Sequence, residues 1–168
     1  MEPIVNKVAE SGILSLDLET FLPKSPVQVF DLKEHLFMGL ILKEKDFRAA
    51  LLATDWEVYR NQHVAITCTA DAIIPMWANM LVAAYLQPLA ASVHFGSAEK
   101  VTQDILLENL TSLQVENYQD QRVVIKGCGE QPVSEAAYVA ATRLLRPVAK
   151  SIMYGEPCST VPIFKKKI

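Results

Sequence analysis

Three cysteines are the residues of this chain best suited to chemistry. Cys68 and Cys128 each follow a short apolar run, and Cys158 lies close to the C-terminal end of the sequence. Thiolates bind zinc and iron, and three of them can hold an iron–sulfur cluster whose fourth ligand is a different group. The pattern predicts a metal or iron–sulfur site built from these three cysteines, with Asp71 as the first candidate for a fourth ligand or an outer group.

The same cysteines allow two further interpretations. Cys68 and Cys128 precede predicted helix N-termini, where the helix dipole favours a thiolate. One of them would then be the nucleophile of a thiol enzyme, with Asp71 or Glu130 moving the proton. The other interpretation is a non-enzymatic, homo-oligomeric subunit whose cysteines are small buried side chains. The sequence contains no glycine-rich phosphate loop, no GxSxG elbow and no HExxH motif.

A repeat predicts how these residues are positioned. Residues 86–96 align without a gap on residues 145–155, fifty-nine positions later, and five of the eleven positions are identical. At the same offset, Val64–Ile66 falls on Val123–Ile125. Each copy reads as strand, helix, strand, which predicts a duplicated β-α-β unit with a parallel, right-handed crossover. Loops after parallel strands gather at one edge of a sheet, so all three thiols are expected on that edge.

The predicted fold class is α/β, with a mostly parallel or mixed sheet and helices on its faces. Strands are expected at residues 64–67, 92–95, 122–126 and 151–154, and helices at 75–88, 99–113 and 134–145. Farther upstream, strands are expected at 13–18 and 27–30, a helix at 46–56, and either type at 36–42. No linker interrupts the sequence, so a single domain is expected over 1–168. Its parts are N-terminal strands and a helix (1–62), the first copy (63–97), a connecting helix (98–121), and the second copy with a tail (122–168).

The composition argues against a disordered, nucleic-acid-binding or membrane-spanning protein. The 168 residues are 51% hydrophobic and 21% charged, with a net charge of −3, which argues against disorder and nucleic-acid binding. Residues 72–98 carry no charge, yet their counterparts in the second copy do. The first copy's helix is therefore expected to be buried all round in a soluble protein, or to pack against a second copy of the chain, rather than to span a membrane. An odd number of cysteines without signal-peptide features predicts a cytoplasmic protein.

Three blocks of sequence carry a resemblance to a known family. They are residues 68–78, Lys126–Gly129 and residues 155–162. Together they resemble an uncharacterised family from the Bacteroidetes that is associated with genomic neighbourhoods for iron–sulfur cluster assembly. The resemblance extends from about Asp55 to Lys165. It implies a role in handling a metal or a cluster, with metal- or cluster-assembly proteins as partners, and it implies no catalytic residues.

Overall fold

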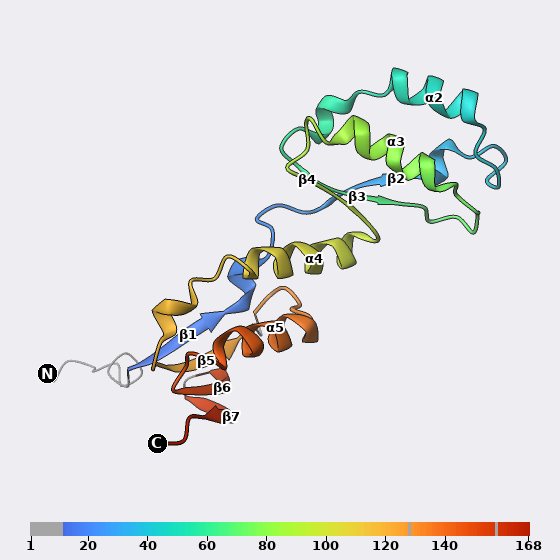
Figure 1. Ribbon diagram of the computed structural model, residues 1–168. Coiled ribbons are helices and arrows are strands. Elements are labelled where there is room, and N and C mark those ends of the chain that lie inside the picture. Colours follow the sequence, from blue (N-terminus) through green and yellow to red (C-terminus); the bar gives the residue numbers. More distant parts are fainter. Residues whose placement is uncertain (1–11, 128, 157) are drawn as a thin grey trace, which may run out of the picture. The chain divides into compact units, whose positions relative to one another are not determined.

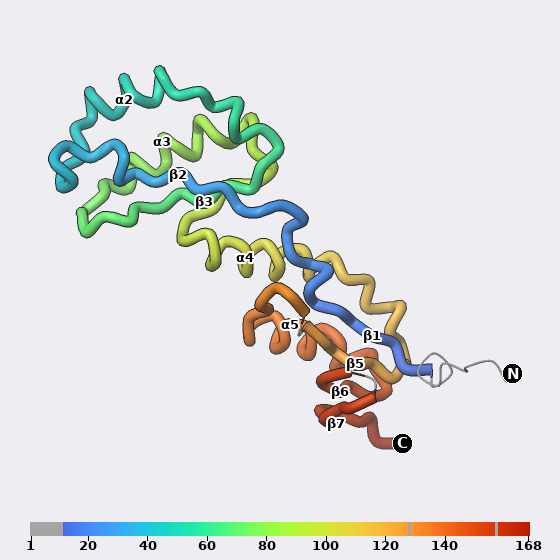
Figure 2. Tube along the Cα trace, turned by 180° about the vertical axis from the view of Figure 1, so that it is seen from behind, coloured from blue at the N-terminus to red at the C-terminus, as the bar shows by residue number. Residues whose placement is uncertain are grey.

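The computed structural model describes residues 12–127, 129–156 and 158–168, and the chain divides into two compact units. Unit 2 is Pro23–Thr102, and unit 1 combines the residues up to Leu22 with Gln103–Ile168. Figure 2 traces the two connections between the units, one after residue 22 and one along the helix that begins at Ala98. The expectation of a single domain over residues 1–168 stays a prediction.

Unit 2 is a three-stranded parallel sheet with two helices on one face (Figure 1). The sheet order is β2-β3-β4. Side chains of α2, α3 and all three strands share one buried core. The elements in chain order are β2 (Gln28–Asp31), the 3-10 helix η2 (Leu32–His35), α2 (Glu44–Ala53), η3 (Trp56–Tyr59), β3 (His63–Thr67), α3 (Met76–Leu86) and β4 (Ser92–Phe95).

Unit 1 contains a four-stranded sheet in the order β1-β5-β6-β7, parallel except for β7. Pro162 lies in β7, the edge strand, where a missing backbone N–H is tolerated. Residues of α4 and α5 pack together with β1, β5 and β6. The elements are β1 (Ile13–Asp17), η1 (Leu18–Phe21), α4 (Ala98–Leu110, which begins in unit 2), η4 (Val115–Tyr118), β5 (Arg122–Lys126), α5 (Glu135–Leu145), β6 (Ser151–Glu156) and β7 (Ser159–Lys165).

The two units place the same kinds of residue at matching positions. We call a residue of unit 2 and the residue fifty-nine positions later in unit 1 equivalent, which is the offset found in the sequence. Equivalent positions are buried in both units across α2 and α4, α3 and α5, and the central strands. The pairs include Phe47 and Leu106, Leu51 and Leu110, Val64 and Val123, Ile66 and Ile125, Ala78 and Ala137, and Leu86 and Leu145.

Local backbone chemistry repeats as well. Asn61 and Asp120 both have a positive φ, 59° and 54°, which is a conformation that these two residue types tolerate better than most. The Asn61 N–H donates to the Leu89 carbonyl at 2.9 Å, and the equivalent Asp120 N–H donates to the Val148 carbonyl at 2.8 Å. These bonds fix the same entry into β3 and β5, so each unit presents its central strand in the same way.

The strands and helices expected from the repeat are confirmed within a few residues, and so is the mixed α/β class. Three expectations change. The strands form two sheets instead of one. Residues 36–42 form neither strand nor helix, but a tight turn with a bridge between Phe37 and Ile41. The helix α3 is not buried all round, because Met76 and Met80 are 80% and 70% exposed. Within the described ranges, no helix is long and apolar enough to cross a bilayer.

Candidate functional site

The two described cysteines lie in different units. Cys68 directly follows β3, is half-buried, and its thiol donates to the Ala70 carbonyl at a sulfur–oxygen distance of 3.7 Å. Cys158 is exposed in the turn between β6 and β7. Cys128 lies outside the described residues. The expected meeting of three thiols assumed one sheet, and that assumption fails because the strands divide between two sheets.

The three-cysteine metal site itself stays a prediction. Across the described ranges, no three His, Cys, Asp or Glu side chains group in a way that could hold a metal ion. Asp71 is exposed on the loop after β3. If Cys68, Cys128 and Cys158 do bind zinc, iron or a cluster, protein purified without chelator contains metal, and a variant with all three changed to serine does not. Equal, near-zero metal in both proteins contradicts the site.

A pocket opens at the carboxyl edge of the unit 2 sheet, beside Cys68. Its volume is about 550 Å³. The rim is unusually exposed for apolar side chains: Met76, Met80 and Phe95 are 80%, 70% and 64% accessible. Ligand pockets in α/β proteins commonly have this size, position and mainly apolar lining. The lining residues are Thr67, Cys68, Ala70, Ala72, Ile74, Met76, Asn79, Met80, Phe95 and Gly96.

A second pocket occupies the equivalent edge of unit 1, with a volume of about 640 Å³. Two carboxylates, Glu130 and Glu135, line it together with two tyrosines. The rings of Tyr138 and Tyr154 meet edge to face, with centroids 5.6 Å apart. Lys126 lies near Glu156 at this edge, with an N–O distance of 3.7 Å. The lining residues are Gly127, Gly129, Glu130, Gln131, Pro132, Val133, Glu135, Tyr138 and Tyr154.

Two glycines let the loop after β5 approach its neighbours. A Cβ on Gly127 would lie 2.7 Å from the Tyr138 hydroxyl oxygen, and a Cβ on Gly129 would overlap the Glu19 carboxylate. That carboxylate accepts a hydrogen bond from the Gln131 N–H at 3.1 Å. The residue equivalent to Gly129 in unit 2 is Ala70. Glycine at 129 therefore makes room for a contact between η1 and the pocket loop.

The loop after β3 is held by a different carboxylate. Asp31 accepts hydrogen bonds from the backbone N–H and the side-chain hydroxyl of Thr69, and from the Lys33 N–H at 2.9 Å. Burial by itself would raise the pKa of Asp31, but the hydrogen bonds from Thr69 and Lys33 outweigh it and lower the pKa. The carboxylate thus stays ionised and anchors the start of the loop that carries Cys68.

Sequence reasoning found Cys68 but missed the pocket around it. Cys68 and Cys128 both follow central strands, but the gap-free offset pairs Cys68 with Gly127 and Thr69 with Cys128. Extending that alignment through the loops shows that the equivalent edges differ in chemistry. The exposure of Met76 and Met80, which marks the pocket rim, follows only from the folded structure.

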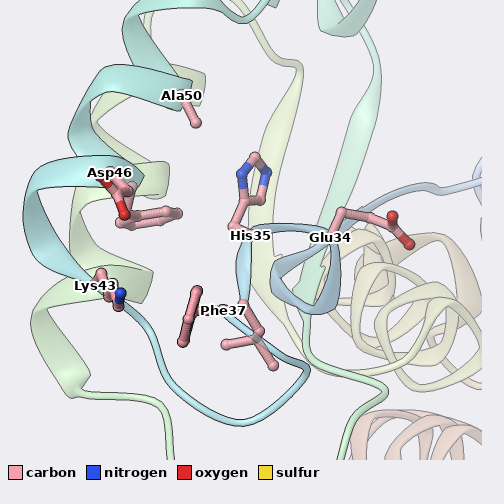
Figure 3. Close-up of a pocket in the computed structure, with 8 residues that line it drawn as sticks. Glu34, His35, Phe37, Lys43, Asp46 and Ala50 are labelled. Carbon is pink, nitrogen blue, oxygen red and sulfur yellow. The ribbon is translucent and has the colours of Figure 1, made fainter.

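A smaller recess of about 270 Å³ surrounds His35 in unit 2 (Figure 3). The imidazole stacks on Phe30 with centroids 5.3 Å apart and meets the edge of Phe47 at 5.5 Å. Burial lowers the pKa of His35, while the neighbouring Glu34 carboxylate opposes that shift. In Figure 3, Glu34 extends away from the imidazole. His35 is therefore mainly a packed aromatic ring.

The fold and the two edge pockets define an α/β protein with two mainly parallel sheets, one in each unit. The sequence model of one family, described as "Protein of unknown function (DUF2480)", matches residues 2–166, so the chain belongs to that family. Neither curated proteins nor solved structures gave a match. The family description mentions neither Bacteroidetes nor iron–sulfur assembly, and those parts of the resemblance stay predictions.

Proposed function

We propose that the protein binds an apolar small molecule in the unit 2 pocket, at the carboxyl edge of β2-β3-β4. The observation that carries this proposal is the apolar rim formed by Met76, Met80 and Phe95 around a pocket of about 550 Å³. Covering such side chains is favourable, since full burial of a Met or Phe side chain is worth about 1.5–3 kcal/mol. A ligand that covers this rim recovers part of that free energy.

Polar groups at the pocket wall would orient the ligand. Thr67, Cys68 and Asn79 are the lining residues that can form hydrogen bonds through their side chains. The described lining includes no Asp, Glu, His, Lys or Arg. A neutral ligand, or the neutral end of a longer one, therefore suits the pocket better than an ion, because a buried charge needs a partner.

The test is binding of the neutral, environment-sensitive dye N-phenyl-1-naphthylamine to the full chain. Met80→Glu places a carboxylate on the rim, and we expect it to weaken binding roughly tenfold or more, which corresponds to about 1.4 kcal/mol. Val139→Glu is the matched control, because Val139 is the equivalent residue on α5 and is 67% exposed. Absence of saturable binding by the unmodified protein, or equal losses in both variants, contradicts the proposal.

The same surface supports a second candidate, a homodimer in which α3 packs against α3 of another copy. Met76, Met80 and Ala84 follow one another at four-residue spacing on the exposed side of the helix. Their equivalents on α5 are Glu135, Val139 and Arg143, so this stripe is charge-free on α3 and charged on α5. An antiparallel pair would set Met76 of each copy near the small Ala84 of the other. Light scattering that shows a monomer at micromolar concentration contradicts this candidate.

A further inference from the structure

Two of the chain's three histidines converge on one serine hydroxyl in unit 2. His63 Nδ1 lies 2.6 Å from Ser92 Oγ, and His94 Nε2 lies 2.9 Å from the same oxygen. The side chains come from neighbouring parallel strands, with His63 of β3 directly opposite Ser92 of β4. All three residues are half-buried. His94 was expected to be a packed strand histidine, and its hydrogen bond to Ser92 gives it a polar neighbour as well.

The cluster lies on the sheet face opposite α2 and α3. Val64, Ile66 and Val93 pack into the core under those helices. Because side chains alternate along a strand, His63, Ser92 and His94 point to the other face. The cluster is therefore separate from the apolar core and from the residues that line the unit 2 pocket.

The hydroxyl restricts the protons in this cluster. Ser92 Oγ has one proton, so it can donate to only one imidazole, and the other ring must donate its N–H to the oxygen. At most one ring nitrogen thus directs a lone pair toward the shared point in the ion-free protein, and the other ring does so only after its N–H proton leaves or moves to the other ring nitrogen. A metal ion placed near that point would be within reach of both imidazoles once Ser92 rotates about its Cα–Cβ bond, and imidazole nitrogens suit Zn²⁺, Cu²⁺ and Ni²⁺.

We propose that His63 and His94 together bind a divalent first-row transition-metal ion, with the Ser92 hydroxyl occupying the shared point in the ion-free protein. Two imidazoles supply half of a tetrahedral ligand set, and the Ser92 oxygen and water supply the rest. Such a site exchanges its ion, unlike a closed structural zinc site. It uses none of the three cysteines and none of the residues that line the apolar pocket.

Unit 1 lacks this donor set. The equivalent residues are Arg122, Ser151 and Met153, so the serine is retained while both imidazoles are replaced. A guanidinium does not ligate a metal ion, because it is always protonated. The proposed metal site is therefore confined to unit 2, and the residues of unit 1 provide substitutions that the same strand positions already accommodate.

The experiment is a Zn²⁺ titration of the full chain, followed through the imidazole signals in NMR spectra. We expect the His63 and His94 signals to shift together and to saturate, while His35 stays unchanged as an internal control. Zinc bound by the cysteines alone would leave the His63 and His94 signals in place.

Two variants complete the test. His94→Met introduces the unit 1 residue and should weaken the zinc-dependent shift of His63 roughly tenfold or more, as loss of a ligand or its support does at other metal sites. His35→Gln is the matched control, and it should leave the zinc-dependent shift of the His63 signal unchanged. The proposal is overturned if His63 and His94 do not respond to millimolar Zn²⁺. It is also overturned if His94→Met leaves the response of His63 intact.

Discussion

The pockets at the carboxyl edges of units 2 and 1 occupy equivalent places and differ in almost every lining residue. Met76 and Phe95 of unit 2 correspond to Glu135 and Tyr154 of unit 1. Beneath the pockets the cores match, as Leu86 and Leu145 illustrate, both fully buried. Core positions admit few side chains because interiors are close-packed, whereas loop and rim positions have no such constraint. The shared scaffold therefore identifies the places where function differs.

The largest effect expected from this comparison concerns the matched cores. Leu86→Ala and Leu145→Ala each remove a fully buried side chain and should each lower the free energy of unfolding by about 2–5 kcal/mol. Urea unfolding followed by circular dichroism measures both losses. If the chain is a single domain, both units unfold in one transition, and each variant shifts that transition to lower urea concentration. Two separate transitions, of which each substitution moves only one, would show that the units unfold independently.

A smaller effect is expected at the loop that differs most. Gly129→Ala pushes the Glu19 carboxylate aside and removes its hydrogen bond to the Gln131 N–H, which should cost about 1 kcal/mol. Glu19→Ala removes the obstacle, so adding Gly129→Ala to that variant should cost much less. Chemical denaturation of the two single variants and the double variant measures this coupling. Strictly additive losses would mean that Glu19 is not what requires glycine at 129.

The turn at residues 37–41 of unit 2 contains a strained residue. Met38 has a φ of 53° and is 79% exposed, so its side chain contributes little packing to offset an unfavourable backbone conformation. Met38→Asn should raise the free energy of unfolding by about 0.5 kcal/mol, since asparagine tolerates this conformation better. The opposite substitution at a residue with a similar φ, Asn61→Met, should lower the free energy of unfolding. A loss of stability in Met38→Asn would mean that the methionine side chain makes stabilising contacts.

The free energy of unfolding should depend on pH through η2 but not through η1, the 3-10 helices that follow the first strand of each unit. The difference is that η2 contains His35 and η1 contains Phe21 at the same place. The pKa of His35 is lowered by burial below its ordinary value near 6.5, so the ring is neutral in both the folded and unfolded chain above that value. As pH falls through 6.5, the unfolded chain binds the proton first and stability decreases, until the folded ring is protonated too. His35→Phe, which introduces the residue found at Phe21 of η1, should remove this decrease. Urea unfolding of the unmodified protein and of His35→Phe across that pH range measures it.

The fold could be predicted where apolar periodicity and the repeat agree. Val64–Ile66, Val123–Ile125 and the helices after them were found because burial demands the same residue types in both copies. The division into two sheets was not predicted, because β1 pairs with β5 and β2 pairs with β3, and local sequence does not specify such distant partners. The pocket was missed because the exposed Met80 reads as a core residue on an apolar helix.

The most direct test of apolar binding in unit 2 is the alkylation rate of Cys68 in the presence and absence of an apolar ligand such as N-phenyl-1-naphthylamine. Peptide mass spectrometry resolves each cysteine, and Cys158, exposed in unit 1, serves as the internal control. A ligand in the pocket should slow alkylation of Cys68 several-fold and leave Cys158 unchanged. Equal rates at Cys68 with and without a saturating ligand, or equal slowing of both cysteines, would contradict binding at the unit 2 edge.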